Sequence, residues 1–168
     1  MLAIALIVLG ILTRFIPHAP NFNPVIAIAL FGGYYLSRKY AVLVPLLLMV
    51  LSDIFLGLHN TMLFTWGSVV LISILGITQK KNKSVLNIAG SSLVSAVLFF
   101  VVTNFGVWIS GWYPYTSKGL ADCFIMGIPF FRATLLSTVV YSAVMFGAYE
   151  LIARRVKNTR FATALLTN

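Results

Sequence analysis

The sequence predicts an all-α, polytopic integral membrane protein with about six transmembrane helices in a single domain, residues 1–168. Of its 168 residues, 60% are hydrophobic and only 9% are charged, and a water-soluble domain of this size cannot hide so much apolar surface. The apolar runs are about 16 to 25 residues long, enough at about 1.5 Å per residue to cross a hydrocarbon core roughly 30 Å thick. Backbone groups in lipid must be satisfied internally, and the alternating pattern of a membrane β-barrel is missing from the sequence, so these spans are expected to be helices.

Prolines, glycines and polar runs divide the chain into its expected spans. The first, residues 1–15, lacks the basic start and the A-x-A cleavage site of a signal peptide, so we expect it to be retained. The others are expected at residues 24–37, 41–58, 62–78, 85–110 and 132–153. Before the last of these, "GWYPYTSKG" is expected to form a loop and "LADCFIMGI" a short interfacial helix that ends at Pro129.

The basic residues indicate how the spans are oriented. With six spans, nine lysines and arginines fall on the side of both termini, whereas only Arg14, Lys118 and Arg132 fall on the other side. The positive-inside rule therefore predicts that both termini lie in the cytoplasm. Because these charges sit in short clusters between apolar runs, the net charge of +9 is attributed to membrane topology, and no nucleic-acid partner is expected.

Polar residues from several segments are expected to meet near the outer surface. An aspartate at the depth of Asp53 costs roughly 2.5–3.5 kcal/mol on insertion scales, so Asp53 is expected to face the bundle interior and to pair with Arg14 or Arg132. Such a cluster could hold helices together or face a substrate, and both interpretations stay open. The candidate substrate-binding residues are Arg14, His18, Asn21, Asn23, Asp53, Asn104 and Arg132.

The first outer loop, "RFIPHAPNFNP", is unusually polar and stiff for a connector between two apolar spans. Its three prolines restrict the backbone, so that its polar side chains are held over the helix ends. A loop ordered in advance loses less entropy when a ligand binds. The alternative is a rigid linker that only sets the angle between the helices.

Other features have a structural interpretation at least as good as a functional one. Thr134, Thr138 and Tyr141 share one helical face but could equally bond neighbouring helices. The aromatic residues near the outer interface suit an aromatic belt as well as ligand stacking: Trp108, Trp112, Tyr113 and Tyr115. Glu150 is expected to pair with Arg154, and Ala29-x-x-x-Gly33 is expected to be a site of close helix packing.

Motifs for catalysis or metal binding are missing. No nucleophile elbow, P-loop, dinucleotide-binding motif or close pair of acids occurs. The possible metal ligands on the outer side have no metal-binding spacing: His18, His59, Met62 and Cys123. We therefore expect neither an enzyme, nor a metal site, nor a cofactor.

Several blocks, in order along nearly the whole chain, resemble a family of small bacterial membrane proteins of uncharacterised function that are described as transport proteins. These blocks are "RFIPHAPNFNPVIAIALFGG", the "LSD" that contains Asp53, "TNFGVW", "YPYTSKGLADC" and "PFFRATLL". More distantly, the layout is similar to the substrate-binding S components of energy-coupling-factor vitamin transporters. That resemblance implies a vitamin site near the outer face, capped by the first outer loop and by the loop between the last two spans.

The resemblance also has a point of departure. S components carry an alanine-x-x-x-alanine motif on the first helix, where they dock the coupling protein, and Ala3, Ala5 and Gly10 here lack that spacing. Docking to an energising module, association with other membrane subunits and solitary function all stay open.

Together these features predict a multi-pass protein of the bacterial cytoplasmic (inner) membrane that captures a small, vitamin-like molecule at an outward-facing site. Its expected partners are membrane lipid and that substrate. The alternative is a structural or accessory subunit of a larger membrane complex. A cavity lined by the candidate residues would favour capture, whereas fully paired polar groups without a cavity would favour the accessory subunit.

Overall fold

The computed structural model describes residues 1–17, 19–159 and 161–166, and over these residues its regular structure is entirely helical. The helices, in order, are α1 (Leu2–Leu12), the short η1 (Thr13–Phe15), α2 (Val25–Tyr35), α3 (Arg38–Leu56), α4 (Met62–Gln79), α5 (Val85–Val107), the π-helical turn η2 (Trp108–Trp112), α6 (Ser117–Val156) and α7 (Ala162–Leu166). Among the described residues, four helices are long and apolar enough to cross a membrane, and the segments Leu2–Phe15 and Val25–Tyr35 are apolar but shorter. The predicted all-helical fold is thus confirmed, and several of its helices suit a membrane-spanning role.

The last predicted span is wrong in its extent. The predicted loop is confirmed at residues 113–116, but the expected interfacial helix and the span at 132–153 belong to one helix, α6, of 40 residues that contains Pro129. It begins where the Thr116 hydroxyl accepts a hydrogen bond from the Gly119 N–H (3.1 Å), which caps the first turn. Proline removes one helical hydrogen bond, but Phe124 and Phe131 pack against Phe100 of α5 on either side of it, so the helix continues.

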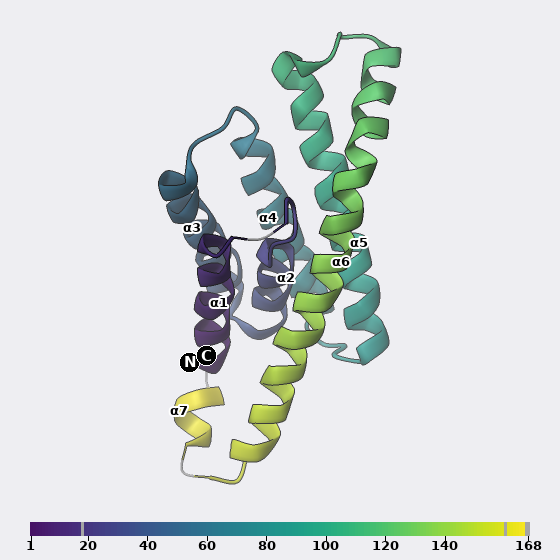
Figure 1. The fold of residues 1–168 in the computed structure, drawn as a ribbon. Helices are drawn as coiled ribbons and strands as arrows, with labels where there is room; N and C mark the ends of the chain where they lie inside the picture. Colours follow the sequence, from purple (N-terminus) through teal and green to yellow (C-terminus); the bar gives the residue numbers. More distant parts are fainter. Residues whose placement is uncertain (18, 160, 167–168) are drawn as a thin grey trace.

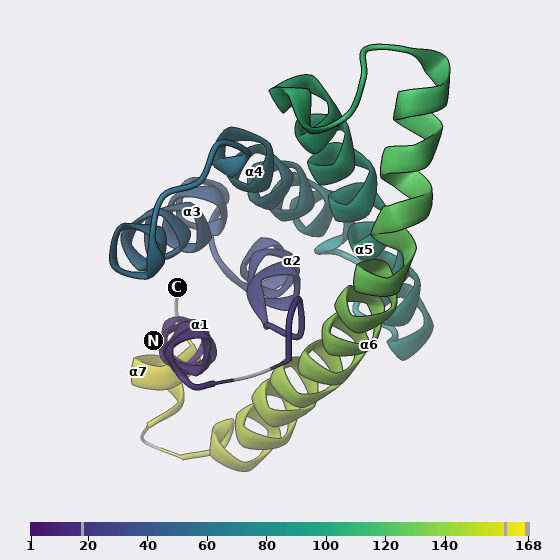
Figure 2. The same ribbon diagram turned by 45° about the horizontal axis from the view of Figure 1, so that its top comes forward.

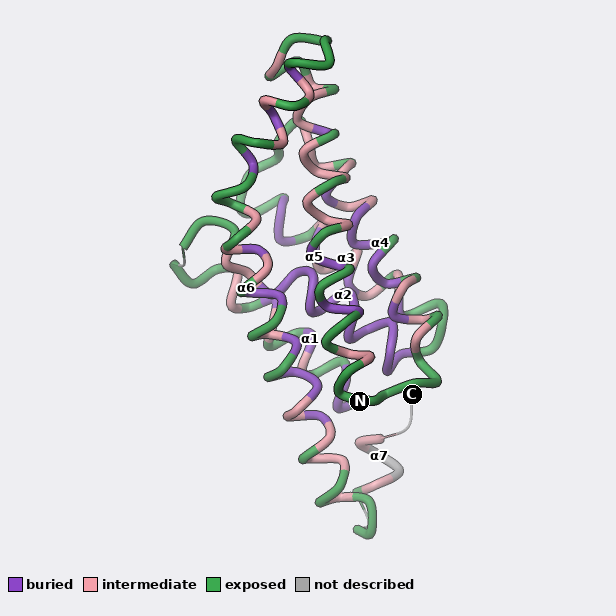
Figure 3. Tube along the Cα trace, turned by 90° about the vertical axis from the view of Figure 1, so that its right-hand side faces the viewer, coloured by how far each residue is buried: buried purple, intermediate pink, exposed green. Residues whose placement is uncertain are grey.

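The length of α6 shapes the molecule. At about 1.5 Å per residue, 40 residues span about 60 Å, roughly twice the hydrocarbon core. The hairpin of α5 and α6 therefore extends beyond the adjoining ends of the other helices, at the top of Figure 1. Much of its surface there is exposed or half-buried, as Figure 3 shows.

Helix α2 lies at the centre of the bundle. All eleven of its residues are buried, and Figure 2 shows it enclosed by α1, α3, α4, α5 and α6. Because α2 contacts protein on every side, it does not have to match the thickness of the bilayer, and its length of about 16 Å is sufficient. The predicted span 24–37 is therefore an internal helix of the bundle.

Two glycines allow α2 to approach α4 closely. A Cβ atom on Gly33 would lie 2.5 Å from the carbonyl oxygen of Ser73 and 2.6 Å from Cα of Gly76. A Cβ atom on Gly76 would in turn lie 2.5 Å from the carbonyl oxygen of Leu30. Ala29 is fully buried on the same helix, so the expectation of close packing at Ala29-x-x-x-Gly33 is confirmed.

The end of α2 nearest the termini is held by Tyr35. Its hydroxyl donates a hydrogen bond to Oε1 of Glu150 (2.7 Å), and its ring lies 4.2 Å from the ammonium of Lys83. The expected ion pair of Glu150 with Arg154 is wrong. Tyr35 is buried and Glu150 half-buried, so this carboxylate turns toward the bundle rather than along the surface of α6.

We expect Tyr35→Phe to lower the free energy of unfolding by about 1.5–3 kcal/mol, because hydrogen bonds to charged groups contribute about this much. Unfolding of the purified protein in a detergent titration would measure the loss. The control is Tyr40→Phe, since Tyr40 is exposed and should tolerate the change. Equal stabilities of the two variants would show that the Tyr35–Glu150 bond contributes nothing.

The loops and charges separate into two ends of the bundle. Both termini lie at one end, where the N-terminal amine donates to the carbonyl of Leu165 (3.4 Å), and residues 80–84 lie there too. Residues 13–17, 19–24, 57–61 and 108–116 lie at the opposite end. The described cations at the terminal end are Arg38, Lys39, Lys80, Lys81, Lys83, Arg154, Arg155 and Lys157. Of the lysines and arginines that the structure describes, only Arg14, Lys118 and Arg132 belong to the opposite half, so the cations are distributed between the two ends as predicted.

Candidate functional site

A cavity of about 370 Å³ lies at the end opposite the termini. It is bounded by the loop after η1, by α3 and α4 with their connection, and by α5 and α6. Its polar lining consists of Arg14, Asn21, Asn23, His59, Thr61, Thr65, Thr103, Asn104 and Thr134. Its apolar lining consists of Val25, Met49, Phe99, Phe100, Val107, Gly127, Phe130 and Phe131. Segments far apart in sequence thus enclose one site.

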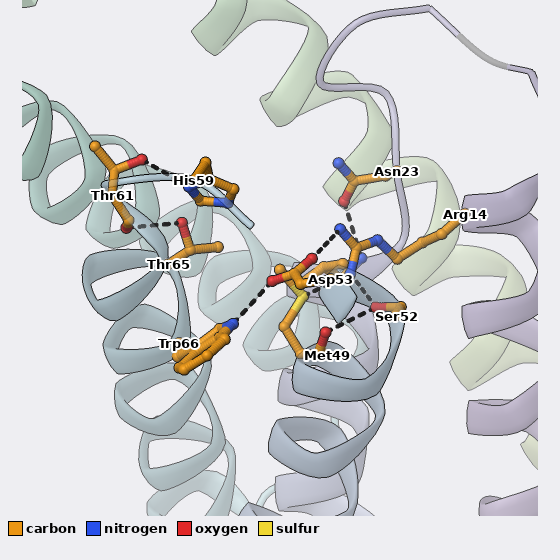
Figure 4. Close-up of polar contacts among 10 residues, drawn as sticks. Arg14, Asn23, Met49, Ser52, Asp53, His59, Thr61, Thr65 and Trp66 are labelled. Carbon is orange, nitrogen blue, oxygen red and sulfur yellow. Dashed lines mark hydrogen bonds and ion pairs between the residues drawn. The ribbon is translucent and has the colours of Figure 1, made fainter. Parts of the chain in front are cut away.

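Arg14 is the cation of this site, and α3 holds it in place (Figure 4). Its Nη2 donates to Oδ1 of Asp53 at 3.0 Å, and its Nη1 donates to the sulfur of Met49 at 2.8 Å and to the hydroxyl of Ser52. A guanidinium has five N–H groups. Three are engaged in these bonds, so two remain for a ligand.

Asp53 lies behind Arg14 rather than on the cavity wall. Its other oxygen, Oδ2, accepts a hydrogen bond from the indole Nε1 of Trp66 on α4 (2.8 Å). The Asp53 side chain is 3% exposed, compared with 12% for Arg14. Asp53 is therefore a positioning residue: it compensates the charge of Arg14 and joins η1, α3 and α4.

The loop before α2 is held by contacts with the start of α2 and with α6. Oδ1 of Asn23 accepts a hydrogen bond from the N–H of Val25 (3.2 Å), which fixes the start of α2. Asn21 adopts the left-handed backbone conformation (φ 60°), which asparagine tolerates better than most residues. The ring of Phe22 packs on Tyr141 of α6 (5.8 Å). The Asn23 amide group points toward Arg14 in Figure 4.

Asn104 and Gly127 form the wall on the side of α5 and α6. Nδ2 of Asn104 donates to the carbonyl of Phe100 (2.7 Å), whereas no described group donates to its Oδ1. A Cβ atom on Gly127 would collide with that Oδ1 and would lie 2.9 Å from Cε2 of Phe100. The missing side chain at position 127 thus leaves room for the Asn104 amide beside the cavity.

Comparison with known families assigns the chain to a family. The model of a family of unknown function (DUF6580) matches residues 1–161. The chain belongs to this family. No curated protein and no solved structure shows significant similarity to it.

In this DUF6580 member, the structure brings together most of the residues expected to form the site. Arg14, Asn21, Asn23 and Asn104 line the cavity, and Asp53 supports Arg14. His18 lies outside the described residues. Arg132 is exposed and lies off the cavity lining, and of the two expected partners of Asp53 it is Arg14 that forms the ion pair. Its neighbours Phe131 and Thr134 line the cavity from the other side of α6.

The residues that sequence reasoning missed include His59 and four phenylalanines. His59 bonds through Nδ1 to the hydroxyl of Thr61 (3.1 Å) and lines the cavity from the connection between α3 and α4. The phenylalanines occur as two doublets, Phe99-Phe100 and Phe130-Phe131, on facing helices. These doublets are the one feature of the sequence that could have indicated that the phenylalanines line a site.

The outer aromatic residues do not line this cavity. Trp108 donates from Nε1 to the carbonyl of Pro114 (3.0 Å) and packs on Tyr115 (5.8 Å). Trp112 is 71% exposed and borders a separate hollow beside His59. Ring stacking on a ligand in the main cavity is thus not their role, and Trp108 and Tyr115 instead pack together at the tip of the α5–α6 hairpin.

The threonine stripe divides between the cavity and the helix itself. Thr134 lines the cavity, but its hydroxyl already donates to the carbonyl of Phe130 (3.1 Å), and buried Thr138 donates to that of Thr134 (2.7 Å). Tyr141 packs on the loop before α2. Over the described residues, no group of three or more His, Cys, Asp and Glu side chains is arranged to hold a metal.

Proposed function

We propose that this protein captures a small, vitamin-like molecule in the cavity at the end opposite its termini, as a membrane transport protein. The observation that carries the proposal is a cavity of about 370 Å³ that combines one cation, amide groups and four aromatic rings. Small-molecule sites are typically mostly apolar cavities with a few converging polar groups.

Unpaired polar atoms favour this function over that of an accessory subunit. A sealed structural network would use its polar atoms internally. Here no described group pairs with Nδ2 of Asn23 or Oδ1 of Asn104, and two N–H groups of Arg14 are left over. By contrast, both oxygens of Asp53 are bonded to protein groups. The cavity wall therefore offers both donors and acceptors to a ligand.

The charge asymmetry supports an outward-facing site in the bacterial cytoplasmic membrane. By the positive-inside rule, the eight described cations at the terminal end would face the cytoplasm, and the cavity would then open toward the outside. This arrangement is similar to that of the S components of energy-coupling-factor transporters. An ATP-binding motif is missing from the sequence, so transport would draw on a partner subunit or an ion gradient.

We expect Gly127→Leu to weaken ligand binding by about 1–3 kcal/mol, roughly 5- to 150-fold in Kd, because the added side chain fills the wall and displaces Asn104. The measurement is native mass spectrometry of the protein purified gently from its own host. The matched control is Gly147→Leu on the same helix, where nothing lies within 4 Å of an added Cβ atom. A small molecule that co-purifies with wild type and the control but not with Gly127→Leu supports the proposal. Retention by all three would place the ligand elsewhere.

We also expect the two ends to differ in accessibility from outside the cell. Cysteines introduced as Ser117→Cys and Asn158→Cys lie at opposite ends, and both positions are exposed. The single native cysteine, Cys123, is first replaced by alanine. A membrane-impermeant maleimide should label Ser117→Cys in intact cells and Asn158→Cys only after permeabilisation. The reverse pattern would put the cavity on the cytoplasmic side.

A further inference from the structure

We infer that the cavity selects a singly charged anion, a small carboxylate with a body of one or two rings, over cationic and doubly anionic molecules of the same shape. This inference rests on the proposed function and names the class of substrate.

The distribution of acids excludes a cationic ligand. The chain has only three acidic residues, and each is already accounted for. Both oxygens of Asp53 are bonded behind Arg14, Asp122 pairs with Lys118 at the hairpin tip (2.7 Å), and Glu150 accepts from Tyr35 at the far end. A cation in the cavity would lie beside Arg14 and would find no free carboxylate, because Asp53 is already paired with Arg14. An unpaired charge is costly in a partly desolvated site.

The available donors suit one carboxylate. Arg14 can lie between the carboxylate of Asp53 and that of a ligand, because three of its N–H groups bond to α3 and two remain free. Asn23 also lines the cavity, and its amide nitrogen is a further donor. The bridged arrangement would thus contain one cation between the carboxylates of Asp53 and the ligand.

A second negative charge on the ligand would find no second lysine or arginine among the described residues of the lining. Arg132 and Lys118, the other cations of this half, lie off the lining. Since the charge of Arg14 is already offset by Asp53, a monoanion would leave one negative charge in the site and a dianion would leave two, which is the more costly. The structure thus favours a monoanion over a dianion.

The size and the apolar lining describe the rest of the ligand. About 370 Å³ is near the lower limit for small-molecule sites, which favours one or two rings. Phe100 and Phe131 pack on each other, with ring centroids 4.7 Å apart, and with Phe99 and Phe130 they form an aromatic wall. The free Oδ1 of Asn104 would accept a bond from an N–H or O–H on the ring.

Isosteric probes test the charge preference. Naphthoate, neutral naphthamide, cationic naphthamidine and a naphthalene dicarboxylate share one ring system and differ in charge. Their affinities for the protein in lipid nanodiscs would be measured by saturation-transfer NMR. We expect naphthoate to bind at least tenfold more tightly than each of the others, with binding lost in Gly127→Leu and kept in Gly147→Leu.

A double variant tests the role of Arg14 itself. The single change Arg14→Gln leaves a buried carboxylate without its cation, so it is combined with Asp53→Asn, which keeps an acceptor for Trp66. Naphthoate should lose its advantage over naphthamide in this variant, whereas naphthamide binding should change less than threefold. An unchanged preference for naphthoate would overturn the role of Arg14.

The outcomes separate this inference from the proposed function. Naphthamide, naphthamidine or the dicarboxylate binding as tightly as naphthoate, and still lost in Gly127→Leu, would overturn the charge class and leave ligand capture standing. A host ligand that co-purifies while no probe binds would also overturn only the inference. If Gly127→Leu changes the binding of neither a host ligand nor a probe, both the charge preference and the proposed capture of a ligand in this cavity are wrong.

Discussion

Asp53→Ala is expected to lower the free energy of unfolding by about 3–5 kcal/mol, because it removes one partner of a buried ion pair. The change leaves the guanidinium of Arg14 without its counter-charge and the Trp66 indole N–H without an acceptor. Both groups are largely shielded from water, so solvent replaces the lost bonds only in part. The loop that begins at Arg14 would lose its main attachment to α3, and ligand binding should fall together with stability.

Two further variants show how much of this loss of stability comes from the burial of the ion pair and how much from the charge of Asp53. Asp122→Ala removes an exposed pair with Lys118, whose side chains are 42% and 84% exposed, and should cost less than about 1 kcal/mol. Asp53→Asn keeps the shape and one acceptor, so it should fall between the two. Unfolding in detergent, followed by the fluorescence of the tryptophans, would give all three values. If Asp53→Ala costs no more than Asp122→Ala, the pair with Arg14 does not hold η1 to α3.

The convergence of polar groups could be predicted because it depends only on the number of spans. Once six apolar segments alternate in direction, Arg14, Asn23 and Asn104 must fall at the same end. The cost of burying a charge then predicts a partner for Asp53. The choice between Arg14 and Arg132 as the partner of Asp53 depends on where α6 begins and how it packs. From the sequence, the start of this helix is expected 15 residues too late, because Pro129 resembles a helix break.

The central position of α2 could not be predicted from its composition. A helix that is apolar on all sides suits either a lipid-facing span or a fully enclosed core helix, and hydrophobic periodicity does not distinguish them. The phenylalanines of the cavity were missed for a similar reason. In a membrane protein Phe99 and Phe130 suit a lipid-facing surface as well as a binding site, and only the packing of α5 against α6 assigns them.

Gly33→Ala and Gly76→Ala are expected to be about as disruptive as loss of the ion pair, at about 3 kcal/mol each, the upper part of the usual range for overpacking. The atoms that the new methyl groups would meet belong to the backbones of α4 and α2, at 2.5–2.6 Å for Gly33, and backbone cannot turn aside as a side chain does. Because α2 is packed on all sides, a shift away from α4 would drive it into α1 or α6.

The contrast with open glycines makes this prediction specific to the α2–α4 contact. Gly67→Ala and Gly90→Ala place a methyl group where no atom lies within 4 Å, and alanine is the better helix former by about 1 kcal/mol. Those variants should therefore match or exceed the wild type in thermal unfolding, while Gly33→Ala and Gly76→Ala unfold at clearly lower temperature. The double variant should cost less than the sum of the two single ones, since separating the helices once relieves both clashes. Equal behaviour of Gly33→Ala and Gly67→Ala would mean that α2 and α4 lie further apart than the glycine contact requires, and that the cavity they help to position is wider.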